Sequence, residues 1–248
     1  MRLEQARTPH NHRVYVVGDI HGRADLLLKL LEMIAADAAE TAKEKVLIYL
    51  GDFIDRGPQS RDVVETVRKG PLAGFRQFAL RGNHEEAMLS FLDDPIDGAG
   101  WLQYGGMETL MSYGVTVHAG VPSPDRLQAA ANALREALPA EHLGFLSELY
   151  DFFVLGDYMF VHAGINPRRP LDRQRPHDLR WIRDPFIGYT GLYDKVIVHG
   201  HTITEKSEFR QNRIGIDTGA YFSGVLTCLV LEEDMKRLLQ TNAADGNG

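Results

Sequence analysis

Three short apolar runs in the first third of the chain each end in glycine and polar residues, and a helical pattern follows each of them. The runs are 13–17, 46–50 and 75–80. The helical patterns, in which apolar residues recur every three or four positions, follow at 25–34, 58–67 and 85–92. Strands that alternate with helices in this way predict a largely parallel sheet with helices on its faces.

The pattern becomes helical between residues 93 and 150 and then returns to strands. Apolar residues at helical spacing cover 107–111, 125–138 and 142–149, which predicts a helical insertion. The later strands are expected at 152–155, 158–161, 195–198, 213–216 and 225–231. Short turns between them favour antiparallel pairing and a second sheet.

These elements together predict the fold class and the domain organisation. No internal repeat or linker divides the chain, so we expect one α/β (α+β) domain, a two-sheet αββα sandwich with the helical insertion at about 93–150. The domain is expected to span 13–240. Residues 1–12 are expected to form an N-terminal tail, and 241–248 a disordered polar tail.

Composition narrows the class of protein without identifying it. The 248 residues are 44% hydrophobic and 25% charged, as in an ordinary globular domain. A net charge of −7 argues against binding of nucleic acid or of membrane surfaces through bulk charge. The single cysteine, Cys228, cannot form an intrachain disulfide, and the first residues lack the apolar core of a signal peptide, so we expect a cytoplasmic protein.

Polar clusters stand at the ends of the predicted strands. The residues in these clusters that could act as ligands are Asp19, His21, Asp52, Asn83, His162 and His201. Because strand ends on one edge of a sheet converge, residues distant in the sequence are expected to meet in one crevice. A set of oxygen and nitrogen ligands without thiolate suits Mn, Fe or Zn.

The six residues exceed what a single metal ion needs. Two divalent ions that share a carboxylate would use all of them and would leave a net positive charge that favours an anionic substrate. Arg56, Arg81 and Arg183 could bind phosphate oxygens, although an ion pair with Asp184 is an equal alternative for Arg183. His84, with Asp55 to orient it, is a plausible general acid.

The ordered motifs GD-x-HG, GD-x-x-DRG, GNHE, HAG and GH-T resemble those of the calcineurin-like metallophosphoesterase superfamily. Within it the chain most resembles the bacterial and phage branch of the phosphoprotein phosphatases, to which Trp101, Gly105 and Gly106 also conform. The resemblance implies a first metal held by Asp19, His21 and Asp52, and a second held by Asp52, Asn83, His162 and His201. It also implies an acid pair, His84 with Asp55, and the phosphate ligands Arg56, Arg81, Asn83 and Arg183.

The activity implied by the resemblance is hydrolysis of phosphoserine or phosphothreonine in proteins by direct attack of a metal-bound hydroxide. The expected cofactors are two divalent ions, with Mn²⁺ preferred and Fe or Zn as alternatives. The expected partner is a phosphoprotein or phosphopeptide, with no nucleic acid and no membrane. Alternatives are a symmetrical diadenosine tetraphosphate hydrolase, a broad-specificity phosphatase, and a noncatalytic protein that retains the fold.

Several residues near these motifs admit a second interpretation. His118 lies in the same tripeptide as His162, but only His162 follows an unbroken strand pattern. His199 shares the strand face of His201, and the GHT context favours His201. Tyr221 and Phe222 either border the pocket or belong to the core, and the core is preferred. Cys228 is expected in the core as a small apolar filler rather than a nucleophile.

Overall fold

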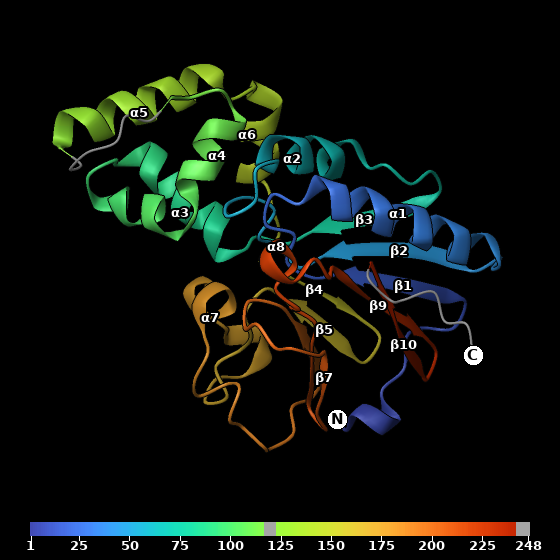
Figure 1. Cartoon of the computed structure of the whole chain (residues 1–248). Coiled ribbons are helices and arrows are strands. Elements are labelled where there is room, and N and C mark those ends of the chain that lie inside the picture. The colour runs from blue at the N-terminus through green and yellow to red at the C-terminus, as the bar shows by residue number, and fades with distance from the viewer. Residues whose placement is uncertain (117–122, 242–248) are drawn as a thin grey trace.

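The computed structural model describes residues 1–116 and 123–241 and contains two five-stranded sheets packed face to face (Figure 1). The first sheet has the order β10-β9-β1-β2-β3. Its strands are β1 (His12–Val17), β2 (Glu44–Tyr49), β3 (Phe75–Ala79), β9 (Thr227–Glu232) and β10 (Met235–Gln240). β1, β2 and β3 run parallel to one another, as the alternation of strands and helices predicts, whereas β9 and β10 are antiparallel additions.

The second sheet has the order β4-β5-β6-β8-β7. Its strands are β4 (Phe152–Leu155), β5 (Tyr158–Val161), β6 (Val196–His199), β7 (Glu208–Phe209) and β8 (Arg213–Gly215). The expectation of antiparallel pairing holds only at its two edges, because β5, β6 and β8 are parallel. The short turn at 155–158 does join an antiparallel pair, but longer connections with helical turns allow the three central strands to run in the same direction.

The sequence pattern placed residues 225–231 in the second sheet, but in the structure they belong to the first. They form β9, which pairs with β1 in the register Val16↔Leu229. β9 is apolar on both faces: Cys228 and Val230 face the helices of the first sheet, and Leu229 and Leu231 face the second sheet. Cys228 is fully buried, which confirms that it fills the core.

Helices cover both outer faces of the sandwich. They are α1 (Ala24–Ala39), α2 (Ser60–Lys69), α3 (Asn83–Asp93), α4 (Gly106–Ser112), α5 (Pro124–Ala137), α6 (Ala140–Ser147), α7 (Pro176–Trp181) and α8 (Ala220–Ser223), with single 3₁₀ turns η1 (Leu3–Gln5) and η3 (Leu171–Arg173) and the longer 3₁₀ segment η2 (Asp97–Tyr104). α1 buries Leu27, Leu30 and Ile34, which recur at helical spacing. α2 begins at Ser60 rather than at Pro58.

Three apolar layers confirm the αββα architecture. The middle layer lies between the sheets and contains Val16 of β1, Phe160 of β5 and Val198 of β6. A second layer joins the first sheet to α1, α2 and the insertion, and a third joins the second sheet to α7. In Figure 1, α1 and α2 lie above the first sheet, and α7 lies to the left of the second.

The helical insertion lies at one end of the sandwich. η2, α4, α5 and α6 gather around α3 and α2 at the upper left of Figure 1. At the N-terminus, η1 leads to Ala6, which is fully buried in the layer between the sheets and accepts a hydrogen bond from Tyr158. Residues 242–248 of the expected disordered tail lie outside the described residues.

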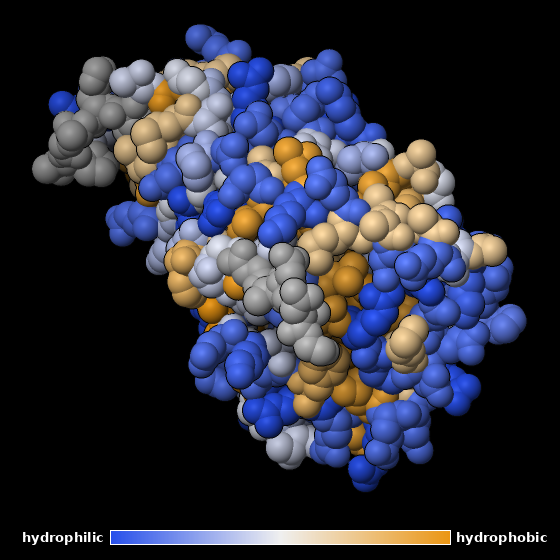
Figure 2. Space-filling view, turned by 45° about the vertical axis from the view of Figure 1, so that its right-hand side comes forward, coloured by the Kyte–Doolittle hydropathy of each residue, from blue (hydrophilic) through white to orange (hydrophobic). Residues whose placement is uncertain are grey.

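The surface is mostly polar in the view of Figure 2, where hydrophilic residues cover most of the face and hydrophobic ones form smaller areas. Within residues 1–116 and 123–241, no helix has the length and apolar character needed to cross a membrane.

Candidate active site

Loops that follow parallel strands of both sheets bring the predicted site residues together. Those from the first sheet are Asp19 and His21 after β1, Asp52 after β2, and Asn83 at the start of α3; those from the second are His162 after β5 and His201 after β6. All six are buried, with at most 6% of their surface exposed. The carboxyl ends of the two parallel strand sets therefore form one polar centre.

The backbone is strained at this centre. Seven non-glycine residues in the described part of the chain have a positive φ, and five of them lie here: His21, Asp52, Asp55, Arg56 and His201. Each such conformation costs about 1–3 kcal/mol and persists only where the surroundings enforce it. Strain of this kind clusters at functional sites, so its distribution is independent evidence that this centre has a function.

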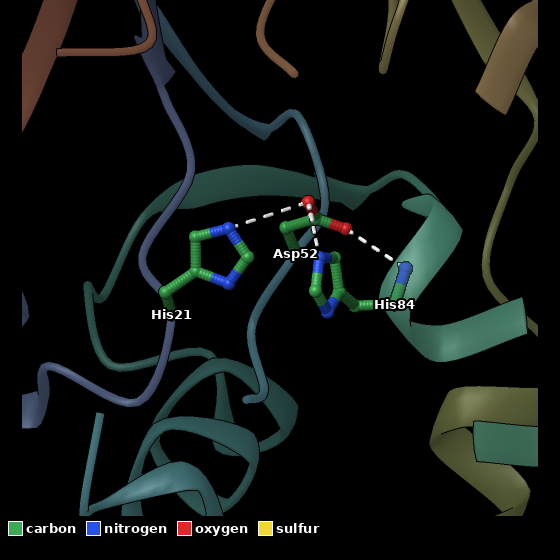
Figure 3. Close-up of side chains that lie close together, drawn as sticks. All are labelled: His21, Asp52 and His84. Carbon is green, nitrogen blue, oxygen red and sulfur yellow. Dashed lines mark hydrogen bonds and ion pairs between the residues drawn. The ribbon is translucent and has the colours of Figure 1, made fainter. Parts of the chain in front are cut away.

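Asp52 is the point at which the ligand groups meet. Its Oδ2 atom lies 3.5 Å from Nε2 of His21, 3.4 Å from Nε2 of His162 and 3.9 Å from Nε2 of His84. Figure 3 shows His21 and His84 on either side of this carboxylate. The other oxygen, Oδ1, accepts a hydrogen bond of 3.1 Å from the backbone nitrogen of His84.

Two groups of three side chains could hold metal ions, and Asp52 belongs to both. One contains His21, Asp52 and His84, and the other contains Asp52, His162 and His201; within each group the ligand atoms lie within 4.8 Å of one another. Asn83 joins the second group, because its Oδ1 lies 3.0 Å from Nε2 of His162. A carboxylate common to two groups is the arrangement that two neighbouring metal ions require.

Asp19 lies at the edge of the centre rather than within the first group. Its Oδ2 accepts a hydrogen bond of 3.0 Å from the backbone nitrogen of His201. Its Oδ1 and the Nε2 atom of His201 are buried and have no hydrogen-bond partner in the described part of the chain. Since buried polar atoms nearly always have partners, two orphaned ligand atoms in one centre fit a bound cation.

The protonation states also suit metal binding. Burial lowers the pKa of His21 to about 3 and that of His201 to about 2, so both imidazoles are neutral at pH 7. Burial opposes ionisation of Asp52, but the imidazoles of His162 and His84 hold its pKa below the ordinary value. Neutral imidazoles and an ionised carboxylate are the forms that coordinate metals.

His84 and Asp55 form a buried pair beside the centre. Nδ1 of His84 lies 2.6 Å from Oδ2 of Asp55, and both residues are almost completely buried. Burial alone would lower the pKa of His84, but the carboxylates of Asp52 and Asp55 raise it above its ordinary value. With Nδ1 donating to Asp55, the Nε2 atom faces Asp52 and the centre.

The three arginines lie in different environments. Nη2 of Arg56 lies 3.3 Å from Nε2 of His84, and its guanidinium stacks 4.7 Å from the ring centroid of Tyr221. Arg183 is exposed, and its charge helps to lower the pKa of His162, whose burial has the larger effect. Among the ion pairs of the described residues there is none between Arg183 and Asp184.

Arg81 contacts the helical insertion in this structure. Its Nη2 atom donates to the carbonyl oxygens of Leu146, at 3.4 Å, and Ser147, at 2.5 Å. These are carbonyls at the C-terminal end of α6, which have no partner within the helix. Through Nη2 the guanidinium therefore caps the insertion helix in this structure, and its role as a phosphate ligand stays a prediction.

Sequence reasoning missed several polar residues of the site. The buried carboxylate of Glu85 accepts hydrogen bonds from the backbone nitrogens of Asp52, Phe53 and Gly82, at 3.0, 2.8 and 2.9 Å, and so fixes the Asp52 loop. Asp217 is buried next to Asp19, and burial raises its pKa to about 6. The Glu of GNHE and the Asp of Ile-Asp-Thr-Gly were visible in the sequence, but nothing there indicated these contacts.

The aromatic residues Tyr221 and Phe222 are not in the core, which corrects the expectation for them. The ring of Tyr221 meets that of His21 edge-on at 5.5 Å, and Phe222 is 63% exposed. His199 points away from the centre, with Nε2 3.3 Å from Nη1 of Arg213, whereas His201 lies within it. His118 lies outside the described residues.

Comparison with known proteins identifies the class. Residues 12–224 match the family model of the calcineurin-like phosphoesterases. The fold and the site thus define a metallophosphoesterase, a class of hydrolase. The chain belongs to the calcineurin-like phosphoesterase family, whose fold implies two divalent metals.

Relatives within the family carry two kinds of name. The chain is 28% identical to serine/threonine-protein phosphatase 1 of Salmonella typhimurium, over 91% of this chain and 94% of that protein. It is 25% identical to a symmetrical bis(5'-nucleosyl)-tetraphosphatase of Methylococcus capsulatus, over 90% of this chain and 93% of that protein. A solved structure provisionally described as a diadenosine tetraphosphatase shares the fold, with a TM-score of 0.65, 20% identity, and coverage of 98% of this chain and 100% of that one.

Proposed function

We propose that the protein is a two-metal phosphatase that hydrolyses phosphoserine and phosphothreonine in proteins. The observation that carries this proposal is the His84–Asp55 pair, which lies beside two candidate metal groups that share Asp52. Such a pair suits an alkoxide leaving group, which needs a proton as the bond to phosphorus breaks. The GD-x-x-DRG and GNHE motifs and the similarity to serine/threonine phosphatases also support this substrate class.

The residues that would hold the metals follow from the site. One ion would be held by Asp19, His21 and Asp52, and the other by Asp52, Asn83, His162 and His201. Once bound, two ions of this kind activate a water molecule at neutral pH and neutralise the charge of the phosphate. We propose Mn²⁺ as the native metal, because carboxylate, amide and imidazole ligands without thiolate suit it, with Fe or Zn as alternatives.

The chain's own groups bind the phosphate and supply the proton. Arg56, Arg81 and Arg183 would donate to phosphate oxygens, where a planar guanidinium can form two parallel hydrogen bonds. His84 would pass the proton on Nε2 to the departing serine or threonine oxygen, while Asp55 holds Nδ1 and stabilises the charged ring. Water supplies the oxygen added to phosphorus, so the products are the free hydroxyl and inorganic phosphate.

A dinucleoside tetraphosphatase is the second candidate, and one observation favours it. Phe222 is exposed next to Tyr221, whose ring touches that of His21, so an aromatic surface borders the centre. Such a surface could stack with a nucleobase. The loop 164–176 favours the protein phosphatase instead, because its exposed Arg168, Arg173 and Arg175 suit an acidic phosphopeptide.

A comparison of kcat/KM for the two substrates tests the proposal. We expect kcat/KM of the Mn²⁺-reconstituted protein to be higher for a phosphothreonine peptide with acidic neighbours than for diadenosine tetraphosphate. Added salt should lower the peptide value, because screening weakens attraction to the arginine loop. A preference of about tenfold or more for the dinucleotide, equal to about 1.4 kcal/mol of transition-state binding, would establish the second candidate instead. A cytoplasmic location and the stated domain limits stay predictions.

A further inference from the structure

The carboxylate of Asp55 is held by side chains from the helical insertion. Its Oδ2 atom accepts a hydrogen bond of 2.8 Å from Nε1 of Trp101, in addition to the 2.6 Å contact with His84. Its Oδ1 atom accepts one of 2.6 Å from the hydroxyl of Thr109. Trp101 lies in η2 and Thr109 in α4, so two elements of the insertion reach the loop after β2.

Thr109 also holds the backbone at Asp55. The backbone nitrogen of Asp55 donates to Oγ1 of Thr109 at 2.9 Å and lies 3.0 Å from Oγ of Ser60. The hydroxyl of Thr109 thus accepts from the main chain and donates to the carboxylate of the same residue. This double contact stabilises a residue whose φ of 73° lies in the left-handed region, which non-glycine residues seldom adopt.

Trp101 is itself fixed in place. Its ring lies 5.1 Å from that of Phe91, and it is only 2% exposed. Gly106 packs directly on the indole, since a Cβ atom there would lie 2.6 Å from two ring carbons. The indole N–H therefore has one available direction, and that direction leads to Asp55.

The chemistry of a buried carboxylate explains why these donors matter. Asp55 has no exposed surface, and no arginine or lysine forms an ion pair with it in the described part of the chain. A carboxylate in such a position needs hydrogen bonds in place of water, and those bonds also fix its rotation. With Trp101 and Thr109 in place, Oδ2 faces Nδ1 of His84, and the imidazole in turn presents Nε2 to the centre.

We propose that Trp101 and Thr109 are positioning residues for the proton transfer. Through these two side chains the helical insertion orients the His84–Asp55 pair. The inference rests on the proposed function in so far as it takes His84 to be the acid. It does not depend on whether the substrate is a phosphopeptide or a dinucleotide. In the described part of the chain, no hydrogen bond joins either side chain to a candidate metal ligand, so we expect their loss to act on the proton donor and to leave metal binding intact.

The test uses three substitutions and a series of phosphate esters. Trp101→Phe removes the N–H and keeps an aromatic ring, Thr109→Val removes the hydroxyl at constant shape, and Thr109→Ser is the matched control that keeps it. We expect Trp101→Phe and Thr109→Val each to lower kcat by about tenfold for phenyl and alkyl phosphates, the loss expected for one hydrogen bond to a charged group. For 4-nitrophenyl phosphate, whose leaving group needs little protonation, kcat should change by less than about threefold.

Two further measurements separate positioning from a general structural effect. In a His84→Ala background, Trp101→Phe should cause no additional loss, because the group that it positions is absent. In the zinc-loaded, diamagnetic protein, a downfield proton resonance from Nδ1–H of His84 should be present in wild type and Thr109→Ser and broadened in the Trp101→Phe and Thr109→Val variants. Metal content and KM should be unchanged in all of them.

Equal losses across all leaving groups, additive losses in the His84→Ala background, or an unchanged downfield resonance would each overturn the inference. Failure of the proposed function gives a different result. If the wild-type protein does not hydrolyse phosphopeptides, the aryl phosphate series and the downfield resonance still test the positioning role of Trp101 and Thr109. If Thr109→Ser behaves like Thr109→Val, the hydroxyl is not the relevant group and its role is refuted.

Discussion

Gly57→Ala is the substitution for which the structure predicts the most specific defect. The loops after β1 and β2 cross at Gly22 and Gly57, where the two backbones are in direct contact. A Cβ atom on Gly57 would lie 2.8 Å from the carbonyl carbon and oxygen of Gly22, and closer still to the carbonyl oxygen of His21. Ordinary van der Waals contact begins at 3.4 Å, so the closest contact, with the carbonyl oxygen of His21, requires one loop to retreat by about 1 Å.

The retreat acts directly on the candidate metal ligands. The same two loops are joined by a 2.9 Å hydrogen bond from the backbone nitrogen of His21 to the carbonyl oxygen of Asp52. Overpacking of this kind costs about 1–3 kcal/mol of stability. A displacement near 1 Å costs about a hundredfold in rate, so Gly57→Ala should lower kcat by about a hundredfold.

The assay compares kcat on 4-nitrophenyl phosphate, metal affinity by calorimetry and urea unfolding. Gly144→Ala in α6 is the control, because nothing lies within 4 Å of its added Cβ and the change should stabilise the helix by about 0.5–1 kcal/mol. We expect Gly57→Ala to lose activity and metal affinity together. Wild-type kcat and metal affinity in this variant would show that the crossing does not set the geometry of the centre.

Three other predictions concern the centre and the first sheet. Asp52→Asn should bind fewer than two metal ions by elemental analysis and lose at least about a thousandfold in kcat/KM, since one unit charge at about 4 Å is worth about 4 kcal/mol; an unchanged two-metal content would disprove its shared role. His84→Ala should keep both metals and lose about 10²- to 10⁴-fold on a phosphoserine peptide and much less on 4-nitrophenyl phosphate, whereas equal losses would remove it from the acid role. Burial raises the pKa of Asp37, but hydrogen bonds from Tyr15 and Arg237 outweigh this effect and hold the pKa below its ordinary value. The contribution of Asp37 to the free energy of unfolding is therefore present above about pH 4 and is lost as the pH falls. Asp37→Asn should therefore destabilise by about 1–2 kcal/mol in urea at pH 7, with a gap that narrows towards pH 3; a gap independent of pH would contradict this.

The fold could be predicted where local patterns decide it. Apolar periodicity identified β1 to β3 and α1 to α3, because each element shows its buried face within its own sequence. β9 was assigned to the wrong sheet for a physical reason. Its two faces, with Cys228 on one and Leu229 on the other, are both apolar, so its sequence does not say which neighbour it pairs with.

The site could be predicted as far as residue type and strand position determine it. Asp52, His162 and His201 were recognisable because they are polar residues directly after buried strands. The partners of Asp55 were not, since Trp101 and Thr109 lie 46 and 54 positions away and reach it only through the packing of the insertion. The helix-capping position of Arg81 likewise depends on where α6 ends in space.

The centre takes its ligands from loops of both sheets, and this has a consequence for the life of the protein in a cell. His162 and His201 follow strands of the second sheet, while His21 and Asp52 follow strands of the first, so a bound ion cross-links the two halves of the sandwich. An ion that binds only the folded state stabilises it by about 2.7 kcal/mol at a free concentration one hundred times its dissociation constant. Protein molecules synthesised during metal starvation would unfold more often and be degraded faster by proteases. The abundance of the protein, and not only its activity, would then follow the metal supply.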